Sequence, residues 1–505
     1  MKVAFIQAET ESLGVEYLSA VLKEAGHTTG LYFEPRLFAD SHVILGGVSR
    51  FFDLKELLVE RIVRDAPDLL CFSVVTDNVR WALDVAEGIR KKQNIFTVFG
   101  GIHASSVPER LIRNAQVDAV CTGEGEEPVV ELAERLERDR AYHDVAGLFV
   151  KHEGKIYSNP VRPLNQDLDT IPFPDKGLYY DPYPFYQNVY TIIASRGCPY
   201  NCSYCNNNVI RRLYRGKGKY LRRRSVSNVV EELKFAKETW NIRAVDFHDD
   251  IFTVDREWLR DLGSNYKKEI GLPFKCIAHV EYLDEDLLAL LEDMGCRNMQ
   301  VGVQTYNEKI RKQVLNRHMT NEQLEKALIP VQNTGIGLIA DHILALPHDD
   351  EQSQVESARF YNRIKPKVIY GFWLTCYPKT EISQYCLEQG LISREDMEAM
   401  EEGNPKTIMT VGGKIKDRDR LLPFQFILGY IPLLPRRLVF FLLDKRRYRF
   451  LPGSPFFATV LPRLIKSFFW KDIRAKLNMN RYTFFIPRVL KFRLRKSKNA
   501  SPPSW

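Results

Sequence analysis

Short apolar runs alternate with longer stretches of helical periodicity over the first 140 residues. The predicted strands are Lys2–Gln7, Asp68–Val75, Phe96–Gly100 and Asp118–Thr122, and the predicted helices are Val15–Ala25, Arg80–Lys91 and Pro128–Leu136. Uniformly apolar strands separated by helices are typical of a parallel sheet that is covered on both faces. We therefore expect an α/β fold in which residues 1–140 form a doubly wound, Rossmann-like domain.

Parallel sheets of this kind bind ligands beyond the carboxyl ends of their strands. In this domain the loops at that edge are Ala8–Gly14, Ser73–Asn78, Gly100–Ser105 and Thr122–Glu126.

A second alternation of strands and helices follows a connecting stretch, residues 141–188. This stretch contains a predicted hairpin, Gly147–Ser158, and a connector rich in Pro and Asp, Pro160–Pro184. Residues 189–390 contain six predicted strands: Tyr190–Ser195, Ala244–His248, Phe274–Ala278, Asn298–Val303, Gly337–Leu346 and Val368–Tyr377. Such a series predicts a partial (β/α)6 barrel. Residues 391–505 are expected to form a helical, basic C-terminal region.

Composition suits a folded cytoplasmic protein. The 505 residues are enough for several domains, and the first residues, MKVAFIQ, lack the basic and long apolar regions of a signal peptide. Of the nine cysteines, three fall within eight residues. This pattern favours a metal site in a reducing cytosol over a disulfide framework.

The clustered cysteines are Cys198, Cys202 and Cys205, after the first strand of the predicted barrel. Their C-x3-C-x2-C spacing allows three thiolates to hold one iron–sulfur cubane and leaves one iron open to an exogenous ligand. An open position is typical of catalytic metal sites. The alternatives are a structural zinc loop or chance clustering of the cysteines, but zinc commonly takes four ligands and no fourth Cys or His is close in sequence.

This loop, with Tyr204 just before its third cysteine, resembles the signature of the radical S-adenosylmethionine (SAM) superfamily. Residues 1–390 are similar to the branch of that superfamily with an N-terminal cobalamin-binding domain. The resemblance implies a [4Fe–4S] cluster whose free iron binds SAM and a 5′-deoxyadenosyl radical that abstracts hydrogen from an unactivated C–H bond. It also implies an electron donor such as flavodoxin or ferredoxin.

The resemblance assigns SAM contacts to several residues. Tyr204 matches the aromatic beside the adenine. Asp249 and Asp250 end the second barrel strand, where the family places a contact to the SAM amino group. Two carboxylates suit an ammonium group, although the same residues also suit a helix cap or a turn.

Two further SAM contacts follow from the resemblance. Gln304 stands where a Glu is usual, so its contact with the ribose or the amino acid would be neutral. Leu346 belongs to the strand whose backbone lies along the adenine, with Ala345 where Gly is typical.

Two glycine-rich loops resemble those of the branch's cobalamin-binding domain. Their residues are Gly100, Gly101 and His103 in the first loop and Gly123, Glu124, Gly125 and Glu126 in the second. Glycines at strand ends let a large ligand approach the backbone, and the resemblance implies cobalamin as a cofactor. The Asp-x-His-x-x-Gly pattern that ligates cobalt in some cobalamin proteins is absent, so we expect no His ligand below the cobalt. His103 also suits a hydrogen-bonded loop histidine.

The last 85 residues, Leu421–Trp505, carry 18 basic and two acidic residues together with 17 aromatics. The longest uncharged run, Leu421–Pro435, is shorter than the roughly 20 apolar residues that span a bilayer. Arg436–Leu443 and Val460–Phe469 mix apolar and basic residues as interfacial helices do, so we expect residues 421–505 to contact the inner face of the membrane. The alternatives are that the tail caps the barrel or that it binds RNA, for which no recognisable module is present.

Together these features predict a cobalamin-dependent radical SAM enzyme that C-methylates a small, apolar or lipid-like substrate. Radical cyclisation, oxidation and C–C coupling use the same cofactors and are the alternative reactions. An alternative of another class is a non-catalytic, cobalamin-binding regulatory protein, against which the intact cysteine triad argues.

Overall fold

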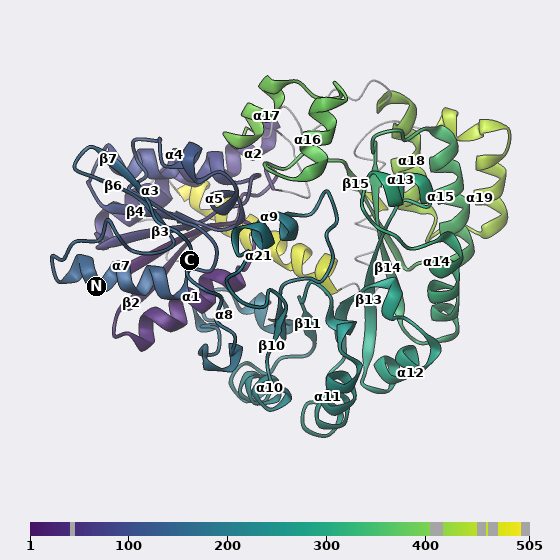
Figure 1. The fold of residues 1–505 in the computed structure, drawn as a ribbon, viewed down its shortest axis with the longest axis horizontal. Coiled ribbons are helices and arrows are strands. Elements are labelled where there is room, and N and C mark those ends of the chain that lie inside the picture. The colour runs from purple at the N-terminus through teal and green to yellow at the C-terminus, as the bar shows by residue number, and fades with distance from the viewer. Residues whose placement is uncertain (41–45, 405–417, 452–460, 463–472, 496–505) are drawn as a thin grey trace.

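Two largely parallel sheets lie side by side in the computed structural model, which describes residues 1–40, 46–404, 418–451, 461–462 and 473–495 (Figure 1). The first sheet belongs to the N-terminal domain and the second to the barrel. Helices of the C-terminal region pack beside β15 and α15 of the barrel, and the last described helix returns to the first domain.

The first sheet has the strand order β2-β1-β3-β4-β5-β6-β7. Its strands are β1 (Lys2–Ala8), β2 (Thr28–Glu34), β3 (Leu69–Ser73), β4 (Phe96–Gly100), β5 (Ala119–Cys121), β6 (Leu148–His152) and β7 (Lys155–Ser158). Its helices are α1 (Leu13–Glu24), α2 (Gly46–Phe52), α3 (Lys55–Asp65), α4 (Val79–Arg90), α5 (Ile102–Ser106), α6 (Pro108–Leu111) and α7 (Glu126–Glu137).

The predicted doubly wound domain is confirmed. Strands β1 to β5 pair in parallel, and the predicted hairpin, β6 and β7, adds two antiparallel strands to the β5 edge. Successive residues of β1 face opposite hydrophobic clusters, Val3 and Phe5 on one side and Ala4 and Ile6 on the other. The sheet is therefore buried on both faces, which explains why its strands have no polar alternation.

A buried cluster of charged side chains attaches the connector to the first domain. The connector contains η1 (Leu168–Thr170), α8 (Gly177–Tyr180) and η2 (Pro184–Asn188). Nζ of the fully buried Lys176 lies 2.6 Å from Glu11 and 2.8 Å from Glu16, which belong to the first domain. Buried charges are tolerated where they are paired in this way, so the connector is fixed on α1.

The second sheet has the parallel order β15-β14-β13-β12-β11-β8, which confirms the partial barrel. Its strands are β8 (Tyr190–Ile192), β11 (Val245–Phe247), β12 (Phe274–Ala278), β13 (Cys296–Gln304), β14 (Gly337–Leu344) and β15 (Val368–Trp373), with a small antiparallel pair, β9 (Ser195–Arg196) and β10 (Arg222–Arg223). Its helices are α9 (Asn206–Leu213), α10 (Val226–Trp240), η3 (Phe252–Val254), α11 (Arg256–Glu269), η4 (Val280–Tyr282), α12 (Glu285–Asp293), α13 (Glu308–Gln313), α14 (Asn321–Leu328), η5 (Pro330–Asn333) and α15 (Glu351–Ile364).

Side-chain caps begin the barrel helices. Ser225, Asp255 and Asp284 each accept a hydrogen bond from a backbone N–H of the first turn of α10, α11 and α12. Such caps satisfy donors that have no partner within the helix, and they fix where each helix leaves its strand.

The C-terminal region is helical, as expected. Its elements are α16 (Glu381–Glu388), α17 (Arg394–Glu401), α18 (Arg418–Tyr430), α19 (Arg436–Leu443), η7 (Asp444–Phe450) and α21 (Ile473–Arg495). Helix α18 packs against β15 and α15, and α19 also packs against α15. None of the described helices is both long enough and apolar enough to cross a bilayer.

Helix α21 returns to the N-terminal domain. Phe485 packs against Phe33 and Tyr183, and the buried Arg481 pairs with the buried Asp40. Parts of the basic, aromatic tail therefore pack within the protein, and the membrane contact expected for residues 421–505 stays a prediction. The segment Val460–Phe469 lies mostly outside the described residues.

Candidate active site

The cysteine loop runs from β9 to α9 at the mouth of the barrel. Gly197 has φ +90°, and a Cβ at this position would meet the carbonyl oxygen of Tyr220 at 2.4 Å, so only glycine fits. Arg211 of α9 reaches back and donates hydrogen bonds to the carbonyl oxygens of Cys198 and Tyr200. The backbone of the loop is thus fixed by its own downstream helix.

The far side of the same loop is held by other elements. Ser203 donates its backbone N–H to Leu315 (3.1 Å) and its hydroxyl to Val314 (2.6 Å), and its carbonyl accepts from Ile382 of α16 (3.0 Å). Residues from distant parts of the chain therefore determine the position of the three cysteines.

The thiols suit an iron–sulfur cluster by their chemistry. Cys202 is buried, and Cys198 and Cys205 are partly exposed. Burial raises the pKa of Cys198 to about 12 and also raises the pKa of Cys205, so iron would have to displace the protons of these two thiols. A guanidinium N–H of Arg317 lies 3.5 Å from Sγ of Cys202, in position to donate to a ligand sulfur.

Within the described part of the chain, no three His, Cys, Asp or Glu side chains are already grouped to hold a metal ion. The three thiols nevertheless share one short loop whose backbone is held by hydrogen bonds from other elements.

Arg317 also connects the cysteine loop to β13. It donates to the carbonyl oxygen of Gly302 at 2.7 Å and lies 3.4 Å from the hydroxyl of Tyr204. Gln304, at the end of β13, is buried with φ +65°, and its side chain folds over Gly302. The guanidinium of Arg317 therefore contacts Tyr204 and the carbonyl oxygen of Gly302, the residue over which the Gln304 side chain folds.

Leu346 lies in the same hydrophobic cluster as Tyr204. The loop after β14 that carries Leu346 is held by Asp349, which accepts hydrogen bonds from the backbone N–H of Ala345 and from Gln354. Burial raises the pKa of Asp349 to about 7.

The two aspartates after β11 have different surroundings. Asp249 is fully buried, and its two oxygens accept from the backbone N–H of Ala194 (3.1 Å) and from the hydroxyl of Ser195. Asp250 is exposed, and its carboxylate accepts a hydrogen bond from the side-chain amide of Asn207 at 2.7 Å. Both oxygens of Asp249 are thus hydrogen-bonded to the chain just before the cysteine loop. Asp250 is therefore the better candidate contact for an ammonium group.

Charged side chains inside the barrel were missed by the sequence reasoning. Asp246 of β11 and Lys275 of β12 are register partners, and Nζ of Lys275 lies 3.0 Å from the carboxylate. Their neighbours Phe247 and Phe274 pack on Tyr266 of α11, so Asp246 and Lys275 point to the opposite side of the sheet, into the barrel.

The next strands continue this polar lining. Nε2 of Gln300 on β13 lies 3.0 and 2.9 Å from the two carboxylate oxygens of Asp341 on β14. His279 follows β12, and its ring stacks on Tyr200 of the cysteine loop at 3.9 Å. Burial lowers the pKa of His279 to about 3, so this imidazole is neutral. The signal available in the sequence was a polar residue in the middle of an otherwise apolar strand.

The first glycine-rich loop of the N-terminal domain packs on the loop that follows the adjacent strand, β3. Gly101 has φ +97°, and a Cβ would meet the carbonyl oxygen of Val74 at 2.7 Å. Gly100 ends β4 with room for ordinary contact. His103 is buried with Nδ1 3.1 Å from the hydroxyl of Thr76, and burial lowers its pKa to about 4. It is a neutral, hydrogen-bonded loop histidine at the carboxyl edge of the sheet.

The second glycine-rich loop contacts the barrel domain. The hydroxyl of Tyr214 occupies the position that a Cβ on Gly123 would need, and it lies 2.6 Å from the backbone nitrogen of Glu124. The carboxylate of Glu124 pairs with Arg222 at 2.5 Å. Gly125 packs closely on Leu18.

Glu126 completes this contact. It pairs with Arg196 at 2.7 Å, and although burial raises its pKa, the guanidinium leaves that pKa below the usual value. The side chains of Glu124 and Glu126 are therefore engaged by Arg222 and Arg196, a contact that we call the interdomain clamp.

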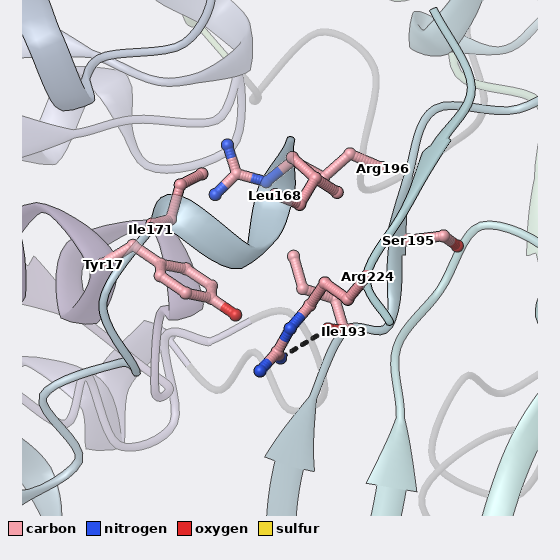
Figure 2. A pocket seen from close by; sticks show the side chains of 7 residues that line it. All are labelled: Tyr17, Leu168, Ile171, Ile193, Ser195, Arg196 and Arg224. Atoms are coloured by element: carbon pink, nitrogen blue, oxygen red, sulfur yellow. Dashed lines mark hydrogen bonds between the residues drawn. The ribbon is translucent and has the colours of Figure 1, made fainter. Parts of the chain in front are cut away.

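A narrow pocket lies beside the clamp (Figure 2). Arg196, Arg224 and Tyr17 line it together with Leu168, Ile171, Ile193 and Ser195. Its volume of about 10 Å³ is far too small for a cofactor. A wider pocket of about 410 Å³ lies beside the cysteine loop, and its lining includes Arg211, Arg212 and Arg215.

Two known families match separate parts of this chain. A profile of the B12 binding domain matches residues 3–133, and a profile of the radical SAM superfamily matches residues 192–361. An uncharacterized methyltransferase of Pyrococcus horikoshii is 26% identical over 404 residues, which are 78% of this chain and 84% of the relative.

Two further relatives differ in their reactions. The hopanoid C-3 methylase of Methylococcus capsulatus is 27% identical, over 74% of this chain and 68% of its own. The anaerobic magnesium-protoporphyrin IX monomethyl ester cyclase of Rubrivivax gelatinosus is 25% identical, over 76% and 70%. Among solved structures, the radical SAM methyltransferase TsrM from Kitasatospora setae, with cobalamin and a [4Fe–4S] cluster bound, has a TM-score of 0.62 at 18% identity, covering 77% of this chain and 78% of its own.

Proposed function

Because the chain belongs to the radical SAM superfamily, in the branch with an N-terminal B12-binding domain, we propose that it methylates an unactivated carbon of an apolar, lipid-like substrate. The protein is a cobalamin-dependent radical SAM enzyme, and its cofactors are a [4Fe–4S] cluster, SAM and cobalamin. The cofactors supply the radical and methyl-transfer chemistry, whereas the chain binds, orients and shields the reactants.

The interdomain clamp is the observation that carries this proposal. It joins the Gly123–Glu126 loop, at the ligand edge of the B12-binding domain, to Arg196, two residues before Cys198. Methylation with these cofactors requires the cobalamin of the first domain and the cluster and SAM of the barrel to act on the same substrate carbon. A clamp of paired charges between the two ligand edges holds them at a fixed separation, as that reaction requires.

Residue roles follow from the described contacts. We assign Cys198, Cys202 and Cys205 to the cluster, with Arg317 donating to Cys202. Tyr204 and Leu346 share one apolar cluster and suit the adenine. The remaining SAM contacts that we assign are Gln304, whose side chain lies beside Gly302, and Asp250, whose carboxylate suits the amino group.

The substrate class rests on the relatives and on the barrel interior. A hopanoid methylase among the relatives favours a lipid-like molecule. The paired groups Asp246–Lys275 and Gln300–Asp341 offer hydrogen bonds inside the barrel, which suits a substrate with one polar end.

The electron donor that we propose is flavodoxin or ferredoxin. Helix α9 follows the cysteine loop directly and carries Arg211 and Arg212, with Arg215 just beyond it. A cationic surface next to the cluster suits the acidic surface of such a donor.

A second candidate reaction is radical cyclisation, which the cyclase among the relatives favours. Both reactions would use the same cofactors and the same residues.

Product analysis after anaerobic reconstitution distinguishes these reactions. Iron, sulfide, cobalamin, SAM and a reductant are supplied with a candidate lipid, and the nucleosides are quantified. Formation of 5′-deoxyadenosine together with S-adenosylhomocysteine and a methylated lipid supports methyl transfer. Deoxyadenosine with a cyclised product and without S-adenosylhomocysteine supports the second reaction. If a fully loaded enzyme forms neither nucleoside, both reactions are contradicted.

A further inference from the structure

Helix α19 and η7 present large apolar side chains to solvent. Leu438, Phe440, Phe441 and Phe450 are 41%, 47%, 54% and 90% exposed. Both elements lie at the outer edge of the barrel domain, and α19 is labelled at the right of Figure 1. Isolated exposed apolar residues are common on proteins, but here four fall within 13 consecutive residues on two elements that pack together, as is typical of an interaction site.

The opposite face of the same segment is firmly attached. Val439, Leu443 and Tyr448 are almost completely buried. The hydroxyl of Tyr448 donates to Glu351 of α15 at 2.9 Å, and Arg449 pairs with the same carboxylate at 2.8 Å. The apolar side chains are therefore displayed by a segment that the barrel holds in place.

The exposed apolar residues lie among cations. Residues 436–450 contain six basic residues and one acidic residue, Asp444. Arg437, Lys445 and Arg446 are exposed, and the guanidinium of Arg447 lies 4.0 Å from the centroid of the Phe441 ring. Apolar side chains surrounded by cations are typical of segments that lie in the interface of an anionic bilayer.

We propose that the α19–η7 surface, formed by Leu438, Phe440, Phe441 and Phe450 with Arg437, Lys445 and Arg446, docks on an anionic lipid bilayer. Its positive charge is complementary to such a bilayer and would repel a second copy of the same surface. The described helices do not span a membrane, so the docking is peripheral. This surface lies outside the cofactor site, and the inference can be tested without the proposed reaction.

Flotation of the full-length, cofactor-loaded protein with vesicles tests the inference. The probes are vesicles of phosphatidylglycerol and phosphatidylcholine, compared with phosphatidylcholine alone. The wild type is expected to float with the anionic vesicles. A Phe440→Ser, Phe450→Ser variant removes apolar contact, and an Arg437→Glu, Arg446→Glu variant reverses charge. Removing two cations near the surface alone weakens partitioning roughly thirtyfold, so we expect at least that loss for the charge variant.

Matched controls come from other faces of the molecule. Phe235 and Ile156 are 48% and 51% exposed, and Arg140 and Arg243 are exposed as well. Phe235→Ser with Ile156→Ser, and Arg140→Glu with Arg243→Glu, should float like the wild type. All variants should keep the wild-type circular dichroism spectrum, cobalamin content and melting temperature.

Three outcomes would overturn the inference. The first is a wild type that does not float with anionic vesicles, and the second is flotation that the α19–η7 variants leave unchanged. The third is a wild-type dimer in analytical ultracentrifugation that both α19–η7 variants convert to monomer, which would assign the surface to a second copy of the chain.

Discussion

At the scale of single residues, Arg317 links more of the candidate site than any sequence motif indicated. Its guanidinium contacts the sulfur of Cys202, the hydroxyl of Tyr204 and the carbonyl oxygen of Gly302. Arg317 lies more than a hundred residues after the cysteine loop, in a stretch without regular structure. Nothing in its sequence surroundings distinguishes it from a surface arginine.

Replacing Arg317 should change the reduction potential of the cluster. A cation that donates to a ligand sulfur stabilises the reduced, more negative cluster. The Arg317→Gln variant should therefore have a potential lower by roughly 60 mV, a tenfold change for a one-electron couple. The potential is measured by redox titration with electron paramagnetic resonance (EPR) detection. Arg317→Lys, which keeps the charge, should fall closer to the wild type, and an unchanged potential in Arg317→Gln would exclude this role.

Asp349 should make stability depend on pH. Burial raises its pKa from 3.8 to about 7, so the folded protein holds a proton that the unfolded chain releases at lower pH. The resulting stability is complete below pH 4 and is lost as the pH rises to about 7. Asp349→Asn mimics the protonated group, so its melting temperature should exceed that of the wild type above pH 7, and the difference should shrink toward pH 4. A difference that is constant from pH 4 to 8 would contradict this assignment.

At the scale of elements, two contacts join parts of the chain that are far apart in sequence. The interdomain clamp holds the loop before α7 against β9 and β10. Helix α21 crosses back to the first domain through Arg481 and Asp40. Both contacts use paired charges that are at least partly removed from water. We therefore expect each to contribute more to the free energy of unfolding than a surface ion pair does.

Neutralising the clamp should loosen the B12-binding domain. In Glu124→Gln, Glu126→Gln, two charge-assisted pairs are lost, and the stability of the interface should fall by about 3 kcal/mol. We expect faster proteolysis in the 158–184 connector and a lower first melting transition. Glu134→Gln, on the same helix but paired only at 3.9 Å with Arg138, is the control and should behave as wild type. Equal proteolysis of the two variants would show that the clamp does not hold the domains.

Removing Arg481 should destabilise the docking of α21. Its side chain is 2% exposed and that of Asp40 is fully buried, so Arg481→Met removes the charge that balances a buried carboxylate, a loss of about 3–5 kcal/mol. Arg488→Met removes the guanidinium of an exposed side chain that lies over the Phe484 ring, and this change should cost less than about 1 kcal/mol. Chemical denaturation measures both, and adding Asp40→Asn should recover part of the loss in Arg481→Met. Equal stabilities for Arg481→Met and Arg488→Met would contradict the buried pair.

At the scale of the whole molecule, the sequence predicted the architecture well because buried parallel strands leave a strong apolar signal. Phe274–Ala278 matches β12 in both bounds, and Phe96–Gly100 matches β4. The cysteine triad was visible because its ligands are local in sequence.

The remaining site depends on contacts between distant residues. The loop of Gly123, Glu124 and Glu126 resembled a ligand loop. The sequence did not show that the hydroxyl of Tyr214 lies against Gly123 and accepts a hydrogen bond from the backbone N–H of Glu124, or that the two carboxylates pair with Arg222 and Arg196. The pairs inside the barrel depend on the register of neighbouring strands. Tertiary packing determines which groups pair, and the local sequence pattern does not indicate these pairs.

The central claim is that one chain holds a three-cysteine cluster and cobalamin, with SAM binding at the open iron. EPR of the anaerobically reconstituted, reduced protein, before and after addition of SAM, tests this claim most directly. We predict about four irons and one cobalamin per chain, a [4Fe–4S] signal that SAM shifts, and loss of that signal but retention of cobalamin in Cys198→Ala, Cys202→Ala, Cys205→Ala. A cluster signal that SAM leaves unchanged, or one that persists in the triple variant, would contradict the account.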